Sequence, residues 1–322
     1  MQFGFTTAQE GRATEAACTT WEQLADQNQL PIDIAAYPDL QSQEAFMKNR
    51  GVDSTYRNHF RVAGVKLSLD GSPQGKTAWL TKPYQVPPVG KHADYTGYPA
   101  FESQTEVNKL VDFAFAKRWQ VLAHCNGDAA IDSFIEAVDS AQTKYGKADY
   151  RPVAIHAQTV REDQLDRFVE LGIFPSFFGM HTYYWGDWHR DQVLGKARAS
   201  RISPAQTARN KGLIYSQHHD APVALPSSMV ILHSVVNRIS RSGVVIGPEE
   251  RVSAYDALRS LTIWAAYQYF EQEHKGSIAV GKLADFVVLD RNPLKVSPAA
   301  LNQLRVQQTI KEGKVVYTYK PK

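Results

Sequence analysis

Four apolar runs in the sequence end on side chains that could bind a metal ion or transfer a proton. These side chains are Lys66 with Asp70, His124, His156 and Asp220. Imidazole and carboxylate groups are ligands that suit zinc. Successive members are separated by one or two strand-helix units of about 30 residues. The pattern therefore predicts a metal site built from two histidines, a carboxylate and a lysine.

Each residue also has a plainer interpretation. A histidine after an apolar strand is more often a hydrogen-bonded core residue than a ligand, and a lone lysine is more often ion-paired or solvated. Asp70 followed by Gly71 is typical of a turn. However, Lys66, Ser68 and Asp70 would share one face of a strand, because strand side chains alternate. Two histidines one unit apart, with a later carboxylate, favour the metal site.

The elements that must position these residues alternate between β-rich runs and amphipathic segments. Seven strands are predicted, over residues 3–10, 32–37, 62–69, 120–124, 153–157, 173–178 and 213–217. Helices are predicted over 105–119, 129–145, 161–171 and 253–270, with Asp128 as the N-cap of the second. This alternation indicates an α/β fold with a parallel sheet, either open or closed as a barrel. In such sheets the loops at the carboxyl ends of the strands carry the active site.

The last part of the chain has a different texture. After Phe270 the sequence contains short β-rich runs with glycine turns and no long helix. These strands need a partner sheet or helix to cover one face. The sequence therefore predicts a main domain over residues 1–272 and a small β element over residues 273–322.

Composition narrows the function classes. The 322 residues are 43% apolar and 21% charged, with a formal net charge of +3, which is typical of an ordinary globular protein. No basic run indicates nucleic acid or an anionic membrane as a partner, and no apolar run is long enough to span a bilayer. The N-terminus lacks the pattern of a signal peptide.

The two cysteines, Cys18 and Cys125, are too few for a disulfide framework. We therefore expect free thiols in a reducing compartment, the cytoplasm. Cys125 would face away from its neighbour His124, which argues against a cysteine nucleophile.

Five motifs, taken in order, carry a resemblance that covers essentially the whole chain. They are KLSLDGSPQGKTAWL, HCNGDAAID, RPVAIHAQ, HHDAPV and GSIAVGKLADFVVLDRNPL. Together they resemble the amidohydrolase superfamily, and within it the YtcJ-like branch that includes N-substituted formamide deformylases. The resemblance implies a (β/α)8 TIM-type barrel with a small β-sandwich assembled from both chain ends. It also implies a metal-dependent hydrolase acting on carbon–nitrogen bonds other than peptide bonds, with a small amide-type molecule as substrate.

The resemblance further implies the roles of the site residues. Lys66 resembles the lysine that becomes carboxylated and bridges metals, and His124 and His156 resemble the histidines of strands five and six. Asp220 resembles the aspartate of strand eight, which would be both a metal ligand and the general base. We expect one or two divalent ions, zinc being the expected metal, and the sequence leaves a homo-oligomer open.

Candidate substrate contacts lie near the same strand ends. His181 could donate to a developing oxyanion, with an exposed loop histidine as the equally weighted alternative. Tyr184 and Trp185 suggest an aromatic wall for the substrate, although an aromatic loop packing on itself is the alternative. Asp70 is a further predicted substrate-binding residue.

One motif of the family is missing. The family carries a His-x-His pair at the end of its first barrel strand, and no two of the ten histidines here are separated by a single residue. The seven predicted strands would then correspond to strands two to eight. We therefore expect two parts, a barrel without its first strand and the C-terminal part of a small β-sandwich. The chain would be a C-terminal portion of a longer enzyme. Either its sequence begins at an internal methionine of that enzyme, or another chain supplies the remaining part. A non-catalytic remnant or assembly subunit is the alternative function.

Overall fold

Two parallel sheets form the framework of the fold. The computed structural model describes residues 1–321. The first sheet has the order β1 (Thr7–Ala13), β2 (Asp33–Pro38) and β3 (Phe60–Val62). The second follows chain order through β4 (Gly64–Ser68), β5 (Gln120–Cys125), β6 (Val153–His156), β7 (Phe174–Phe177) and β8 (Ser216–Gln217). Every pairing within these two sheets is parallel, which confirms the α/β class with a parallel arrangement.

The strand predicted over 62–69 is wrong in its detail, because the chain breaks at Ala63 into β3 and β4. The two pieces pair with the same neighbour, since β3 pairs with β2 and a parallel bridge joins Asp39, just after β2, to Lys66. Gly64, at the start of β4, allows β5 to approach closely, because a Cβ there would lie 2.4 Å from the carbonyl oxygen of Gln120 in β5. Seven strand positions thus follow one another from β1 to β8. Among the described residues no strand pairing joins β8 to β1, and closure into a barrel stays a prediction.

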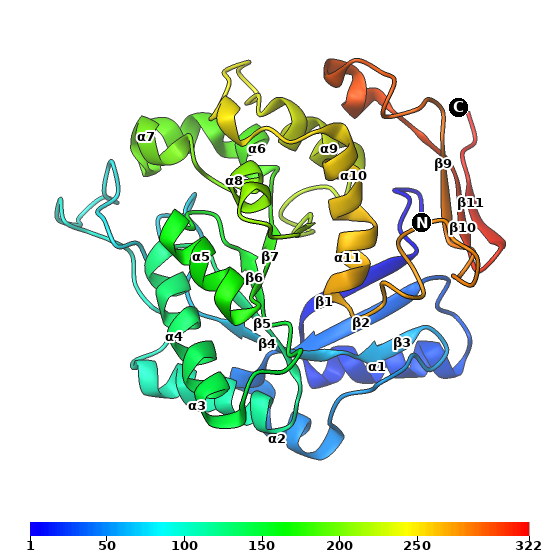
Figure 1. Cartoon of the computed structure of the whole chain (residues 1–322), viewed down its shortest axis with the longest axis horizontal. Helices are drawn as coiled ribbons and strands as arrows, with labels where there is room; N and C mark the ends of the chain where they lie inside the picture. The colour runs from blue at the N-terminus through cyan, green and yellow to red at the C-terminus, as the bar shows by residue number, and fades with distance from the viewer. Residues whose placement is uncertain (322) are drawn as a thin grey trace.

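Helices follow most strands and cover the sheets. Those in the first half of the chain are α1 (Glu15–Asp26), α2 (Leu40–Arg50), α3 (Gln104–Ala116), α4 (Asp128–Tyr145) and α5 (Glu162–Leu171). Figure 1 shows α3, α4 and α5 side by side along the outer side of β4 to β7. Ile131, Phe134 and Val138 are fully buried at helical spacing on α4. Asp128 begins this helix instead of capping it, because Gly127 is the N-cap.

Shorter helices fill the second half of the main region. They are α6 (His181–Trp188), a π-helix (His189–Val193), α7 (Gly195–Ala199), α8 (Ala205–Asn210), α9 (Ser228–Asn237), a 3₁₀ turn (Pro248–Glu250), α10 (Ala254–Leu261) and α11 (Ile263–Gln268). The single helix predicted over 253–270 is therefore wrong. Thr262 breaks it with φ −128° and ψ −99°. Among the described residues no helix is both long and apolar enough to cross a membrane.

The last strands form a separate antiparallel sheet. Its order is β11 (Lys314–Thr318), β10 (Val306–Lys311) and β9 (Phe286–Leu289), with a 3₁₀ helix (Pro298–Gln303) between β9 and β10 in the chain. The N-terminal segment lies beside it in Figure 1. The Thr309 hydroxyl donates to the Met1 carbonyl at 2.8 Å. Both ends of the chain therefore meet at this sheet. The domain boundary at residue 272 and the β-sandwich stay predictions.

The parity argument for β4 agrees with the packing. Val65 and Leu67 are fully buried in the main core cluster, whereas Lys66 pairs in register with Leu122 of β5. Leu122 belongs to a second, smaller cluster with Ile155 of β6. Paired residues of a sheet point to the same face. Lys66 therefore points to the face opposite the main core, as its alternation with apolar neighbours predicts.

Candidate metal centre

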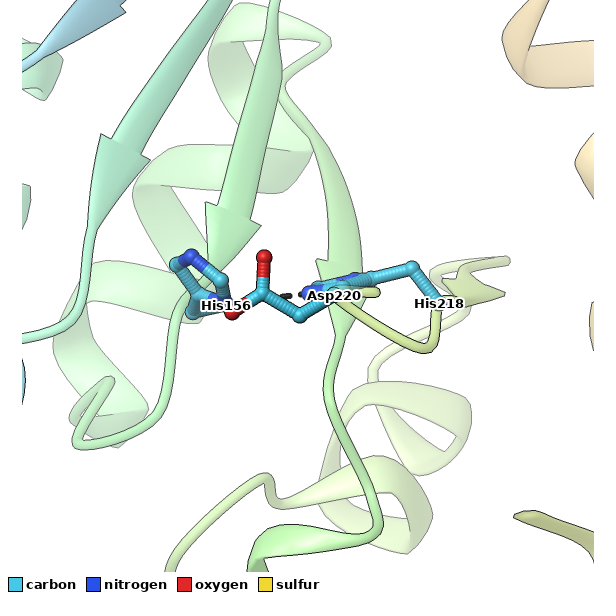
Figure 2. A group of neighbouring side chains, drawn as sticks. All are labelled: His156, His218 and Asp220. Carbon is cyan, nitrogen blue, oxygen red and sulfur yellow. Dashed lines mark hydrogen bonds between the residues drawn. The ribbon is translucent and has the colours of Figure 1, made fainter. Parts of the chain in front are cut away.

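Three potential metal ligands converge past the carboxyl ends of the second sheet. His156 is the last residue of β6, and His218 and Asp220 follow β8. One donor atom from each lies within 4.8 Å of the other two, and Figure 2 shows the three side chains directed toward one another. Two ligands of one zinc ion lie at most about 4.2 Å apart. A small side-chain adjustment would therefore bring all three donors to one ion, and the donor set of two imidazoles and a carboxylate fits it.

The backbone at this centre takes an uncommon conformation. His156 has φ +70° and Asp220 has φ +54°, values that residues other than glycine rarely adopt. Such backbone costs free energy and persists where the surrounding structure enforces it, which is frequent at functional sites. His156 is buried and Asp220 is exposed, so the cluster extends from the interior to the surface.

Histidine rings form a continuous hydrogen-bonded row through the centre. His218 Nε2 lies 3.0 Å from His156 Nδ1, and His156 Nε2 lies 3.1 Å from His124 Nδ1. The outer nitrogens at the two ends of this row have other partners. His218 Nδ1 lies 3.1 Å from the Ser176 hydroxyl, and His124 Nε2 lies 3.1 Å from the Gly71 carbonyl oxygen. The rings are therefore fixed from outside, with nitrogens facing one another inside.

Burial favours the neutral forms of the ionisable groups at the centre. Burial and the nearby Lys66 lower the pKa of His124 to about 4. The pKa values of His156 and His218 are also well below that of a free histidine, and burial is the largest cause. Burial lowers the pKa of Lys66 to about 8, an effect that Asp220 opposes. Burial raises the pKa of Asp220, whose carboxylate lies among these groups although the residue as a whole is exposed. Neutral imidazole is the form that binds metal ions, so the three histidines are in the form that a metal ion requires.

Lys66 and His124 accompany the cluster from neighbouring strands. Lys66 is buried on β4, with 6% of its surface exposed. It lies near enough to disfavour the charged forms of all three histidines of the row. The structure thus brings together the four positions that the sequence marked as ligands, Lys66, His124, His156 and Asp220.

His181 and the aromatic residues after it lie next to this row. His181 begins α6 with 2% of its surface exposed, so the alternative of an exposed loop histidine is wrong. Its ring centroid lies 6.2 Å from that of His156, and its Nδ1 has no hydrogen-bond partner among the described residues. The Trp185 ring lies 5.8 Å from the His181 ring and 5.5 Å from the ring of Tyr184. These aromatic side chains are therefore at hand for a substrate wall.

Asp70 is placed differently from the other candidates. Its side chain is fully buried, and its carboxylate accepts hydrogen bonds from the backbone N–H groups of Trp79, Asn126 and Gly127. The carboxylate is thus engaged with the backbone. Its predicted contact with substrate stays a prediction.

Sequence reasoning missed His218. It lies two positions before Asp220, so the two residues share a face if the strand continues past Gln217. The same alternation that linked Lys66 with Asp70 would have found it.

A second group of potential ligands is a charge network. Asp33, His59 and Glu312 also offer donor atoms within 4.8 Å of one another. However, the Lys275 and Lys311 ammonium groups lie 2.5 and 2.8 Å from Asp33 Oδ2. A divalent ion would meet two cations there, so this group does not fit a metal.

Known proteins that are similar to this chain in sequence or structure include metal-dependent hydrolases. A model of the Amidohydrolase family matches residues 1–317. The chain is 28% identical to YtcJ of Bacillus subtilis over 266 residues, which cover 80% of this chain and 48% of that protein. It is 28% identical to the N-substituted formamide deformylase of Arthrobacter pascens over 217 residues, 67% of this chain and 40% of that enzyme. The structure of an uncharacterized metal-dependent hydrolase from Pyrococcus furiosus superimposes with a TM-score of 0.78 at 25% identity, covering 91% of this chain and 58% of that one. The chain spans less than half the length of the two sequence relatives.

Proposed function

Since the chain belongs to the Amidohydrolase family, in the branch of YtcJ and N-substituted formamide deformylase, we propose that it carries the metal centre of a hydrolase. The proposed reaction is hydrolysis of an amide-type carbon–nitrogen bond in a small molecule. The convergence of His156, His218 and Asp220 is the observation that carries the proposal. These residues would hold a divalent ion, which their donor types favour as zinc.

The metal and the protein would divide the chemistry. A divalent ion at this centre supplies a lowered pKa for water and polarises a carbonyl group. The Asp220 carboxylate would accept a proton from the attacking water and deliver it to the leaving nitrogen. The raised pKa of Asp220 supports this role, because a carboxylate that holds a proton more firmly is a better base.

Lys66 would join the centre as a carboxylated lysine. An ammonium group has no lone pair for a cation, whereas a carbamate presents anionic oxygens. The neutral amine bonds to the carbon of carbon dioxide and releases one proton when the carbamate forms. A pKa of about 8 leaves an appreciable share of Lys66 in the neutral form near neutral pH, which supports this modification.

The remaining candidates would contact the substrate. His181 is buried beside the histidine row, and within residues 1–321 its Nδ1 has no hydrogen-bond partner. As a hydrogen-bond donor it would stabilise the developing oxyanion of the amide. Tyr184 and Trp185 would form an apolar wall against the substituent on the substrate nitrogen.

The Asp220→Asn variant tests the proposal. Wild-type chain loaded with zinc is assayed against a panel of N-substituted formamides and simple amides. We expect hydrolysis of at least one compound by wild type, and loss of that hydrolysis in the variant while zinc stays bound. Turnover that survives the substitution would remove Asp220 from the base role. A wild-type chain that binds zinc and hydrolyses no compound would favour a non-catalytic role.

A further inference from the structure

The Asp70 carboxylate joins three parts of the chain at one buried point. Its Oδ1 accepts from the Asn126 backbone N–H at 3.0 Å. Its Oδ2 accepts from the N–H groups of Gly127 at 2.7 Å and Trp79 at 3.1 Å. Charge-assisted hydrogen bonds of this kind are roughly twice as strong as neutral ones. A carboxylate with three of them in a dry environment has a fixed position.

The three backbone N–H donors belong to two segments of the chain, and Asp70 holds these segments in place relative to each other. Asn126 and Gly127 connect β5 to α4, and Gly127 is the N-cap of that helix. The N-terminus of a helix carries partial positive charge, which further favours a carboxylate there. Trp79 belongs to residues 69–103, which connect β4 to α3 without a helix or strand. Asp70 therefore ties this long connection to the start of α4.

The same carboxylate lies beside a histidine of the metal centre. His124 Nε2 is 3.5 Å from Asp70 Oδ1 and 3.1 Å from the Gly71 carbonyl oxygen. The Asn126 side-chain amide, 3.0 Å from the same ring nitrogen, donates to that carbonyl at 2.9 Å. Two oxygen acceptors near Nε2 favour a hydrogen on this nitrogen. The Asn126 amide nitrogen can only donate and would favour a bare Nε2, but it already donates to the Gly71 carbonyl. The two oxygens therefore favour the tautomer with its hydrogen on Nε2. In that tautomer the lone pair of Nδ1 faces His156.

We infer that Asp70 is a positioning residue for His124. Through the β5–α4 turn, Asp70 fixes the orientation of the His124 ring. Its own carboxylate, beside Nε2, favours one tautomer of that ring. Through its bond to the Trp79 N–H, Asp70 also couples the ring to the long connection between β4 and α3. The effect on metal binding depends on the proposed metal centre. The effect on the ring of His124 does not, because the contacts exist without a metal.

The Asp70→Asn variant tests this role, with Asp128→Asn as its matched control. Asparagine keeps the shape but turns an amide group toward backbone N–H donors. Asp128 begins the same helix and holds the same long connection through the Thr81 N–H at 2.9 Å. Among the described hydrogen bonds and ion pairs, none joins Asp128 to His124. A merely structural anchor of the connection would therefore behave alike in both variants.

Two measurements separate this inference from the proposed function. Histidine-selective ¹⁵N NMR of the metal-free chain near neutral pH gives the tautomer of His124. We expect the Nε2–H form in wild type and Asp128→Asn, and a mixture of tautomers in Asp70→Asn. Titration with Co²⁺ should show about 10- to 100-fold weaker binding in Asp70→Asn, with an altered cobalt absorption spectrum at saturation, as for other partners of metal-bound histidines.

The outcomes decide the two claims independently. Wild-type tautomer and cobalt spectrum in Asp70→Asn would overturn the positioning role. Absence of cobalt from the wild-type chain would overturn the proposed function, while the NMR measurement still decides the effect on His124. If Asp70→Asn does not fold, Asp70→Glu moves the carboxylate by one methylene and should give an intermediate tautomer ratio. An unchanged ratio in that variant would overturn the inference.

Discussion

The molecule buries ionisable groups at both ends of its parallel strands, with opposite electrostatic outcomes. At the carboxyl ends His124, His156 and His218 lie together with Lys66, and burial lowers the pKa of all four. At the amino ends lies a charge network in which acids and bases are paired. Its members are Asp33, Arg61, Glu271, Lys275, Lys311, Asp285 and Glu312.

The network contains its own counter-charges. Burial alone would raise the pKa of Asp33, but Lys275, Lys311 and His59 lower it. Burial alone would lower the pKa of Lys311, but Asp33 and its neighbours raise it. The metal centre has several nitrogen bases and one exposed carboxylate. The comparison teaches that buried ionisable groups stay charged and stabilise the fold where opposite charges surround them, and become neutral where bases are gathered without enough acids.

Lys311→Met should have the largest effect and separates the two regions. Lys311 has 3% of its surface exposed and contacts Asp33, Asp285 and Glu312. Removing one partner of a buried ion pair leaves uncompensated charge and costs about 3–5 kcal/mol. Urea unfolding of the metal-free chain measures this loss. Lys147→Met, at an exposed position, is the control and should lie within about 0.5 kcal/mol of wild type. Equal stability of the two variants would refute the structural role of the network.

His218→Ala should remove metal binding and leave most of the stability intact. His218 supplies a donor to the centre, while the neighbouring His219 packs edge-on against the Phe5 ring at 4.9 Å. We expect at least about a 100-fold loss of zinc affinity in His218→Ala, more than for a residue that only supports a ligand. His219→Ala should bind zinc as wild type does. Calorimetric titration measures both affinities, and an equal loss in the two variants would show that His218 is not a specific ligand.

Mild acid should destabilise the chain through His189, a buried histidine near the centre whose ring lies 3.2 Å from the Gln158 side-chain amide. Burial lowers the pKa of His189 to about 3, whereas an unfolded histidine titrates near about 6.5. The unfolded state binds the additional proton between these values, so stability falls as the pH falls through this range. His189→Gln removes this group and should give a shallower decline in urea unfolding between the two pH values. A slope equal to that of wild type would contradict the assignment.

The charge network around Asp33 should lose stability only at a lower pH than the metal centre does. The pKa of Asp33 is lowered in the folded state, so its contribution is complete above the pKa of an unfolded aspartate, about 3.9. That contribution is lost only as the pH falls below this value toward the folded pKa. The two regions thus have separate pH windows.

Trp185→Ala should have the smallest effect. Its ring lies 5.8 Å from His181, and an aromatic contact of this kind contributes about 0.5–1.5 kcal/mol. We expect KM for amides with aromatic substituents to rise roughly 2- to 12-fold. KM for small aliphatic amides should stay as in wild type. A uniform change for both substrate classes would remove Trp185 from the substrate wall.

The sequence predicted the main features of the site because they depend on local periodicity. Alternation placed Lys66 opposite the core, and strand ends placed His124, His156 and Asp220 at one edge. His218 had a usable signal in its spacing from Asp220. These features need only the geometry of a single strand and the convergence of parallel strand ends.

Features that depend on contacts between distant segments were not predictable in the same way. The break at Thr262 has no glycine or proline to announce it. The network joins Asp33 to Lys275 and Lys311, which lie more than two hundred residues away. The anchoring of Trp79 by Asp70 likewise depends on the path of the long connection between β4 and α3. Such pairings are set by tertiary packing, which single-segment patterns do not contain.

Metal content tests the central claim most directly. The purified chain and its His156→Ala variant are loaded with zinc, freed of unbound ions by gel filtration and measured by inductively coupled plasma mass spectrometry. We predict at least one ion per wild-type chain and a clear loss in the variant. A wild-type chain that emerges without zinc, or a variant that retains the same amount, would contradict the metal centre.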